Sequence, residues 1–273
     1  MPLEASDDAL APILELARDL AARAGAIQRT RYETDLRVDT KSASIDLVTE
    51  VDRACEALIV EGIEAARPDD AILAEEGHGE DRDAPFRWII DPLDGTTNFA
   101  HGFPRLCVSI GVERRTKTGD YARAVGVVYD PLLDERFEAV RGDGAWLRDR
   151  RLAVSAESEW GRALVATGFA YDVHRSEDDN LESFRNVVKS ARGIRRDGSA
   201  ALDLCYVAAG RVDAYWELKL HPWDVAAGYL ILEEAGGRVT DFRGGPPDRS
   251  GREVASSNGR LHAALLERIV RPA

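Results

Sequence analysis

The stretch WIIDPLDGTTNF, residues 88–99, begins with an apolar run and continues into turn-forming residues. Short apolar runs that stop at Asp, Pro or Gly are typical of buried strands, so we expect a strand that ends at Asp91. Open α/β sheets bind their ligands at the carboxyl ends of such strands. Pro92 cannot continue a central ladder, and Gly95 permits a tight turn. The stretch predicts a strand, a turn that carries the carboxylates of Asp91 and Asp94, and then a helix N-terminus.

This predicted arrangement has a chemical meaning. Two carboxylates in all-oxygen surroundings suit a hard cation such as Mg²⁺, and the free amides at a helix start suit a phosphate. A metal beside a phosphate indicates phosphoryl chemistry. Taken alone, the motif is equally compatible with an acidic turn that caps a helix, because Asp, Pro and Gly are ordinary turn residues.

Composition narrows the class of protein. Hydrophobic residues make up 44% and charged residues 31% of the 273 residues, which is typical of a globular protein. The net charge of −13 argues against a general binder of nucleic acid or anionic membranes, so an anionic substrate would need local cations. Three scattered cysteines predict no disulfide framework, and no apolar run approaches the roughly 18 residues that span a membrane. Residues 1–10 lack the apolar region of a secretion signal, so we expect a cytoplasmic protein.

Residues 1–150 are expected to form an α+β half. Helical spacing of apolar residues predicts helices over 8–28 and from Val51 to about residue 66. A short strand, 71–74, runs into Glu75 and Glu76. Alternation with a period of two then predicts an antiparallel sheet of hairpins, with strands at 106–114, 121–130, 135–140 and 144–148.

The polar segment 36–50 between the two helices is expected to be a loop. It carries one candidate cation, Lys41. Asp46 and Asp52 lie near the start of the second helix, where acids are often simple caps.

Residues 151–273 show an α/β pattern. No linker rich in Pro, Gly or Ser separates the two halves, so we expect them to pack closely. The predicted strands lie at 163–169, 193–195, 212–218, 238–242 and 253–257, and the predicted helices at 176–192, 199–210, 221–237 and 259–271.

Four acids occupy comparable positions. Glu75 and Asp91 end strands, Asp94 lies in the following turn, and Asp224 begins a helix. Spacing alone does not prove that they converge. If they do, several close carboxylates need cations to remain ionised. Two metal ions about 3.5–4 Å apart could then clamp a phosphate ester and activate water for in-line attack.

These motifs resemble those of the inositol monophosphatase family of Mg²⁺-dependent, lithium-sensitive phosphatases, in particular its bacterial inositol-1-monophosphatase-like branch. Residues 91–104 (DPLDGTTNFAHGFP) are similar to the first family signature, and 221–237 (HPWDVAAGYLILEEAGG) to the second. The Glu75-Glu76 pair and residues 41–52 and 193–217 resemble other recurring segments, in the right order. The resemblance covers nearly the whole chain, and it is far more specific than DPLDG alone.

The resemblance implies a fold: a layered αβαβα sandwich of the sugar-phosphatase type. The antiparallel sheet would lie in the half formed by residues 1–150, with most of the metal ligands. A mixed sheet would lie in the half formed by residues 151–273, with Asp224 and the substrate contacts.

The resemblance also implies metal ligands. Glu75, Asp91 and the carbonyl of Leu93 would hold one Mg²⁺, and Asp91, Asp94 and Asp224 a second. A third, weaker ion would lie near Glu75.

Catalytic roles follow from the same resemblance. Thr96, hydrogen-bonded to Asp52, would act with Glu75 to activate the attacking water, without a covalent intermediate. The amides of Gly95 and Thr96 would hold the phosphate, together with Asp94 and Asp224. Lys41 would lie on a loop that closes over the site.

Substrate contacts are implied as well. Ala200 and Glu217 match positions that contact the hydroxylated ring in inositol-type members. Glu217 favours a neutral polyol but could equally pair with the amine of histidinol phosphate. The segment TGFAYD, 167–172, departs from the animal inositol enzymes, which leaves room for fructose 1,6-bisphosphate or a broad range of sugar phosphates.

Two further expectations concern partners. The resemblance favours a homodimer. It also admits a regulatory role, since some bacterial members that resemble this chain bind transcription machinery. Arg195 and Arg196 could serve an anion site, a dimer interface or salt bridges.

Overall fold

The computed structural model describes residues 9–41 and 47–270. The expectations for Asp46 and for residues 1–8 lie outside these segments. The helices are α1 (Leu10–Arg31), α2 (Glu50–Ala66), α3 (Thr96–Ala100), α4 (Leu181–Val188), α5 (Ala200–Ala208), α6 (Pro222–Glu234) and α7 (His262–Leu266), with a 3-10 turn η1 (Trp160–Arg162).

The strands form two large sheets and one hairpin. The hairpin pairs β1 (Val38–Thr40) with β2 (Leu47–Thr49). The seven-stranded sheet contains, in spatial order, β3 (Ala71–Ala74), β4 (Phe86–Asp94), β5 (Cys107–Arg115), β6 (Tyr121–Asp130), β7 (Glu135–Val140), β8 (Gly144–Leu147) and β9 (Arg150–Arg151). The five-stranded sheet contains, in spatial order, β11 (Gly193–Arg195), β10 (Leu164–Thr167), β12 (Ala214–Leu218), β14 (Glu253–Ser257) and β13 (Arg238–Thr240).

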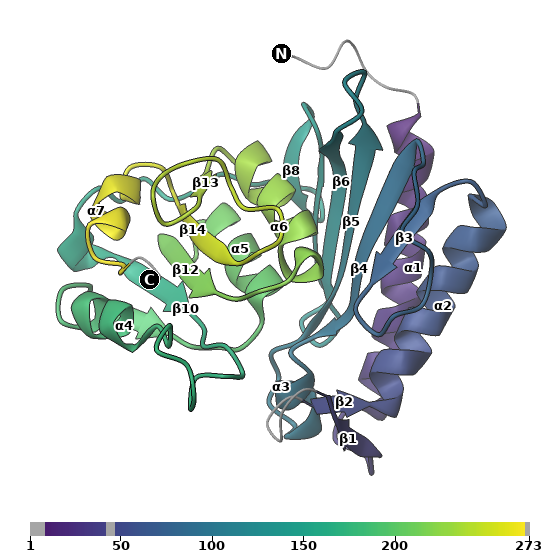
Figure 1. The fold of residues 1–273 in the computed structure, drawn as a ribbon, viewed down its shortest axis with the longest axis horizontal. Helices are drawn as coiled ribbons and strands as arrows, with labels where there is room; N and C mark the ends of the chain where they lie inside the picture. Colours follow the sequence, from purple (N-terminus) through teal and green to yellow (C-terminus); the bar gives the residue numbers. More distant parts are fainter. Residues whose placement is uncertain (1–8, 42–46, 271–273) are drawn as a thin grey trace.

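Helices and sheets alternate in five layers (Figure 1). α1 and α2 cover the outer face of the seven-stranded sheet, α5 and α6 lie between the two sheets, and α4 and α7 cover the far face of the five-stranded sheet. Three clusters of buried apolar side chains fill the four interfaces between these layers, because one cluster extends to both sides of α5 and α6. The predicted αβαβα sandwich is therefore confirmed.

The sheets are nearly as predicted. β4 to β9 pair antiparallel in sequence order, while β3 joins β4 in parallel because the loop 75–85 returns the chain to the end where β3 began. The five-stranded sheet is mixed, with β10 parallel to β11 and β12, and β14 antiparallel to β12 and β13. The sheet in the first half is thus antiparallel apart from one edge strand.

Three local predictions were wrong. The segment 36–50, expected as a loop, contains the hairpin β1–β2. β4 does not end at Asp91 but continues to Asp94, and Pro92 is tolerated because it lies where the pairing with β5 shifts register. α4 begins at Leu181 rather than at residue 176, because Asn180 adopts a left-handed φ of 63° and donates to Gly168 O instead of continuing a helix.

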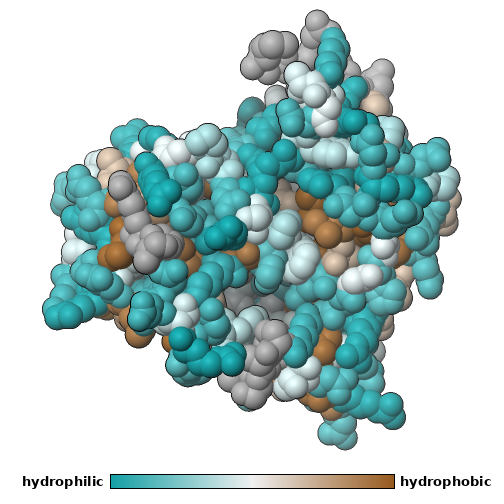
Figure 2. All heavy atoms as spheres, in the orientation of Figure 1, coloured by the Kyte–Doolittle hydropathy of each residue, from teal (hydrophilic) through white to brown (hydrophobic). Residues whose placement is uncertain are grey.

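The surface agrees with the acidic composition. Hydrophilic side chains cover most of the face shown in Figure 2, and hydrophobic side chains appear in separate small areas. None of the described helices is long and apolar enough to cross a membrane.

Two paired glycines bring α6 close to the seven-stranded sheet. Gly111 on β5 lies opposite Gly126 on β6. A Cβ atom on Gly126 would lie 2.8 Å from the carbonyl oxygen of Ala227, and one on Gly111 would lie 2.7 Å from the Cβ of Ala226. The backbone of α6 therefore rests directly on the sheet, which sets the position of Asp224 in its first turn.

We expect Gly126→Ala to lower the free energy of unfolding by about 1–3 kcal/mol, because the added methyl would force α6 away from the sheet. Gly161→Ala is the matched control, since a Cβ there would meet nothing within 4 Å. Urea denaturation of both variants measures the difference. Equal stability of the two would show that α6 does not depend on the close approach.

Candidate active site

The DPLDG segment, which forms the end of β4 and the turn after it, is tightly constrained. Asp91 Oδ1 accepts a hydrogen bond of 2.9 Å from the amide of Leu93, and both residues are buried. Gly95 has a φ of +99°, and a Cβ atom there would lie 2.7 Å from the carbonyl oxygen of Arg105. Only glycine fits this position without strain. The backbone thus fixes the direction in which the two acids project.

Asp52 is both a helix cap and a partner of the turn. It accepts hydrogen bonds from the amide and hydroxyl of Thr49, which caps α2. Its other oxygen accepts a 2.7 Å hydrogen bond from the Thr96 hydroxyl. Asp52 is fully buried, and burial raises its pKa above the usual range. The predicted hydrogen bond between Thr96 and Asp52 is present. Asp52 caps α2 with one oxygen and binds Thr96 with the other, so the two contacts are compatible.

Glu75 directly follows β3. Its amide still bonds to the Ile90 carbonyl, at 3.2 Å, so it continues the pairing with β4. Its carboxylate accepts a 2.8 Å hydrogen bond from the Lys41 ammonium, which also contacts the carboxylate of Glu76. Lys41 thus meets the acid that was expected to hold metal.

Asp94 is held by the second half of the chain. Its Oδ2 accepts hydrogen bonds from the Ser199 hydroxyl, at 2.7 Å, and from the Ala201 amide in the first turn of α5, at 2.8 Å. A carboxylate is stabilised at a helix N-terminus, because free amides point toward it. Asp224 in the first turn of α6 likewise accepts a 2.7 Å bond from the His221 amide.

The four acids sense one another electrostatically. Burial raises the pKa of Asp91 well above its usual range, with further contributions from Glu75, Asp94 and Asp224. The same causes raise the pKa of Asp224, and burial raises that of Asp94 to about 6 despite its hydrogen bonds. Glu75, Asp94 and Asp224 thus lie within electrostatic range of Asp91.

The donor set fits Mg²⁺ in its chemistry. It consists of oxygen ligands on partly or fully buried carboxylates whose mutual repulsion a divalent cation would relieve. Among residues 9–41 and 47–270, however, no three His, Cys, Asp or Glu side chains lie as a group that could hold a metal ion. In this structure the carboxylates are hydrogen-bonded to local donors: Glu75 to Lys41, Asp94 to Ser199, and Asp224 to the His221 amide.

Glu217 and Ala200 border the acids from the second half. Glu217, on β12, accepts a 2.6 Å hydrogen bond from the Tyr215 hydroxyl, and burial raises its pKa to about 7. Arg196 lies near enough to oppose that rise. Ala200 is the first residue of α5. Nothing in these contacts assigns Arg195 or Arg196 to an anion site.

Three residues that the sequence analysis did not identify hold the segments of the site by hydrogen bonds. Ser199 holds Asp94, as described above. Gln28 on α1 donates a 2.7 Å bond to the Pro92 carbonyl, and Glu56 on α2 holds the loop after β3. Gln28 had a visible signal, because it continues the four-residue spacing of buried Ala24 with a polar side chain.

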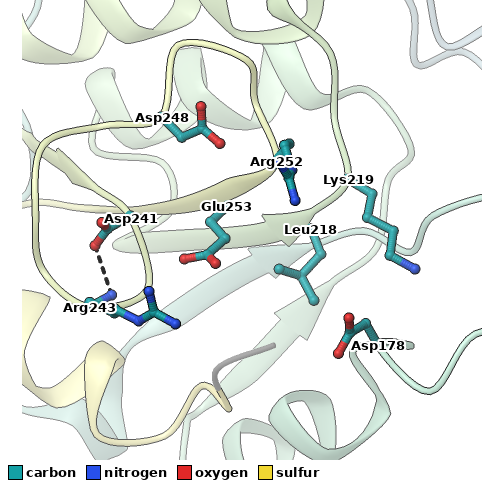
Figure 3. A pocket seen from close by; sticks show the side chains of 8 residues that line it. All are labelled: Asp178, Leu218, Lys219, Asp241, Arg243, Asp248, Arg252 and Glu253. Carbon is teal, nitrogen blue, oxygen red and sulfur yellow. Dashed lines mark hydrogen bonds between the residues drawn. The ribbon is translucent and has the colours of Figure 1, made fainter. Parts of the chain in front are cut away.

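A separate cavity of about 350 Å³ lies at the carboxyl end of β12, next to Leu218 and Lys219 (Figure 3). Acidic and basic side chains line this cavity, and none of its lining residues belongs to the predicted site. The residues that line it are Asp178, Leu218, Lys219, Asp241, Arg243, Asp248, Arg252 and Glu253.

Comparison with known proteins gives a consistent result. The model of the inositol monophosphatase family matches residues 9–272. An inositol-1-monophosphatase from Synechocystis sp. is 44% identical over 93% of this chain and 87% of its own length, and a Nus factor SuhB from Pasteurella multocida is 42% identical over 94% and 96%. The solved structure of an inositol monophosphatase from Anabaena (Nostoc) sp. is 41% identical, covers 95% of both chains and has a TM-score of 0.84.

The fold, the acidic site and these similarities define an enzyme, a phosphoric monoester hydrolase. The chain belongs to the inositol monophosphatase family.

Asp94 should make the metal-free protein less stable as pH rises. Its pKa is raised to about 6 in the folded state, above the value of 3.8 for the free side chain, so the folded state binds the proton more tightly. Its contribution to stability is present in full at low pH and is lost as pH rises through 6.

We therefore expect Asp94→Asn to lose less stability than the wild type between pH 5 and pH 8. Thermal denaturation in the presence of a chelator measures this difference. The substitution also removes the charge that raises the pKa of Asp91 and Asp224, which changes the profile in the same direction. Identical pH profiles of the two proteins would show that ionisation of Asp94 does not destabilise the folded state.

Proposed function

We propose that the chain is a Mg²⁺-dependent phosphatase that acts on inositol monophosphate or a related polyol phosphate, by direct in-line attack of water. The observation that carries the proposal is the buried Thr96–Asp52 hydrogen bond beside Asp91 and Asp94, two carboxylates whose pKa values are raised by burial and by neighbouring acids. A binding module would have no need to cluster carboxylates at such a cost.

In this proposal the carboxylates of Glu75, Asp91, Asp94 and Asp224 and the carbonyl of Leu93 hold two Mg²⁺ ions, with a third, weaker one near Glu75. When bound, Mg²⁺ neutralises the carboxylates and polarises the phosphate ester.

Thr96 and Asp52 orient the attacking water. The Thr96 hydroxyl donates a hydrogen bond to Asp52, so its oxygen lone pairs remain available to accept a hydrogen bond from water. The amides of Gly95 and Thr96 hold the phosphate. The water oxygen attacks phosphorus as the bond to the ester oxygen breaks on the opposite side. One proton of the water passes to the leaving alkoxide oxygen, so the products are inorganic phosphate and an alcohol.

The proposed substrate is a hydroxylated ring. Glu217 and the start of α5 at Ala200 border the metal site, and a carboxylate accepts hydrogen bonds from hydroxyls. The relatives from Synechocystis and Anabaena, both named as inositol monophosphatases, support this choice. Histidinol phosphate and fructose 1,6-bisphosphate are the alternatives, because a Glu217 that is ionised could also bind an amine.

A second candidate function is regulatory. The relative from Pasteurella multocida is named a Nus factor, which favours binding to transcription machinery in addition to catalysis. A cytoplasmic homodimer would suit both functions. Asp94→Asn should then lose hydrolysis while it still co-purifies with the transcription machinery of its host.

We expect Mg²⁺-dependent release of phosphate from inositol 1-phosphate that exceeds release from histidinol phosphate, fructose 1,6-bisphosphate and phosphoadenosine phosphate. Lithium should inhibit this release. A phosphate-release assay over the four substrates, with and without chelator, provides the test. Activity that persists in chelator would contradict the metal requirement, and a different preferred substrate would replace the inositol assignment.

We expect Thr96→Val to lower kcat on the order of a hundredfold, because the water would lose its orienting hydroxyl. Thr97→Val is the matched control: the Thr97 hydroxyl is buried without a hydrogen-bond partner within the described segments. Steady-state kinetics of both variants at saturating Mg²⁺ measures the contrast. If the two substitutions lower kcat equally, Thr96 has no special role.

A further inference from the structure

Glu56 is a buried acid to which the proposed mechanism gives no role. It lies on α2 one helical turn after Asp52, and both side chains are fully buried. Its Oε2 accepts a 2.7 Å hydrogen bond from the Glu76 amide. Its Oε1 accepts a 3.0 Å bond from the His78 amide and lies 2.7 Å from the Nδ1 of the same residue. One carboxylate thus holds the loop after β3 at three points.

These contacts place Glu75 between two fixed points. On one side its own amide bonds to the Ile90 carbonyl at 3.2 Å, as part of the pairing between β3 and β4. On the other side the next amide, that of Glu76, is held by Glu56. With the backbone anchored on both sides, the direction of the Glu75 side chain is restricted.

A carboxylate is the group that this task requires. Two backbone N–H groups on adjacent parts of a loop need two acceptor atoms, and Glu supplies both. A Gln side chain would offer one acceptor and turn an NH₂ group toward the other amide. A further negative charge close to Asp52, Glu75 and Glu76 is electrostatically unfavourable. What Glu56 provides in return is a fixed loop geometry, through its hydrogen bonds to the Glu76 and His78 amides.

We propose that Glu56 is a positioning residue that aims Glu75 at the metal site. This inference rests on the proposed function, in which Glu75 is a metal ligand. α2 then acts as a common support: Asp52 holds Thr96 after β4, and Glu56, one turn later, holds the loop that carries Glu75 after β3.

The test compares Glu56→Gln, Glu56→Ala and Glu138→Gln in the full chain. Glu138 is the matched control, a buried glutamate on β7 that is held by Arg18 and Arg136 and does not contact the site. Titration calorimetry with MgCl₂ gives the affinity for metal, circular dichroism with thermal denaturation gives folding, and phosphate release gives kcat.

We expect Glu56→Gln to weaken Mg²⁺ binding on the order of tenfold, as residues that orient metal ligands do, with kcat restored at high Mg²⁺. Glu56→Ala, which lacks both acceptors, should weaken it further. Glu138→Gln should lower the melting temperature and leave Mg²⁺ affinity unchanged.

Other outcomes would overturn the inference. Unchanged affinity in Glu56→Gln, with wild type binding Mg²⁺ normally, would remove the positioning role and leave the proposed function intact. Equal weakening in Glu56→Gln and Glu56→Ala would assign the effect to lost charge instead. A wild-type protein that neither binds Mg²⁺ nor needs it for hydrolysis would overturn the proposed function itself.

Discussion

The repulsion among Glu75, Asp91, Asp94 and Asp224 is the constraint around which the molecule is arranged. Burial and like charge raise the pKa values of Asp91, Asp94 and Asp224, so ionisation of these acids at neutral pH destabilises the folded protein. A chain that keeps such a cluster must hold it by other contacts. Amides from turns and helix N-termini do this, since each donates to a carboxylate without adding a competing side chain.

Both halves of the chain contribute to this support. α2 reaches the site from the outer layer and bonds Thr96 through Asp52, and α5 reaches it from the middle layer and bonds Asp94 through Ser199. The glycine pair on β5 and β6 lets α6 lie directly on the sheet, which brings Asp224 alongside. The site therefore exists only where the outer helices, the first sheet and the middle helices meet, and neither half holds it alone.

Local patterns were sufficient for part of the fold and the site. Hydrophobic periodicity located most helices and strands, and the layered architecture followed from the family resemblance. Periodicity failed for β1–β2, whose strands are only three residues long and of which β1 is fully exposed, and for the start of α4, where the side chain of Asn180 competes with the helix. The supports Glu56, Ser199 and Gln28 were missed because a polar residue inside an apolar pattern does not reveal which distant amide, carboxylate or carbonyl it meets.

By itself the sequence determined the turn that carries Asp91 and Asp94 and the family to which its motifs point, because these depend on short-range spacing and residue chemistry. Only the tertiary structure decided how these groups are held: Asp94 by α5, Thr96 by Asp52, and the loop after Glu75 by Glu56. Each of these contacts joins segments of the chain that lie far apart in sequence. The physical reason is that hydrogen bonding and electrostatic coupling depend on distance in space, and packing of the layers sets that distance.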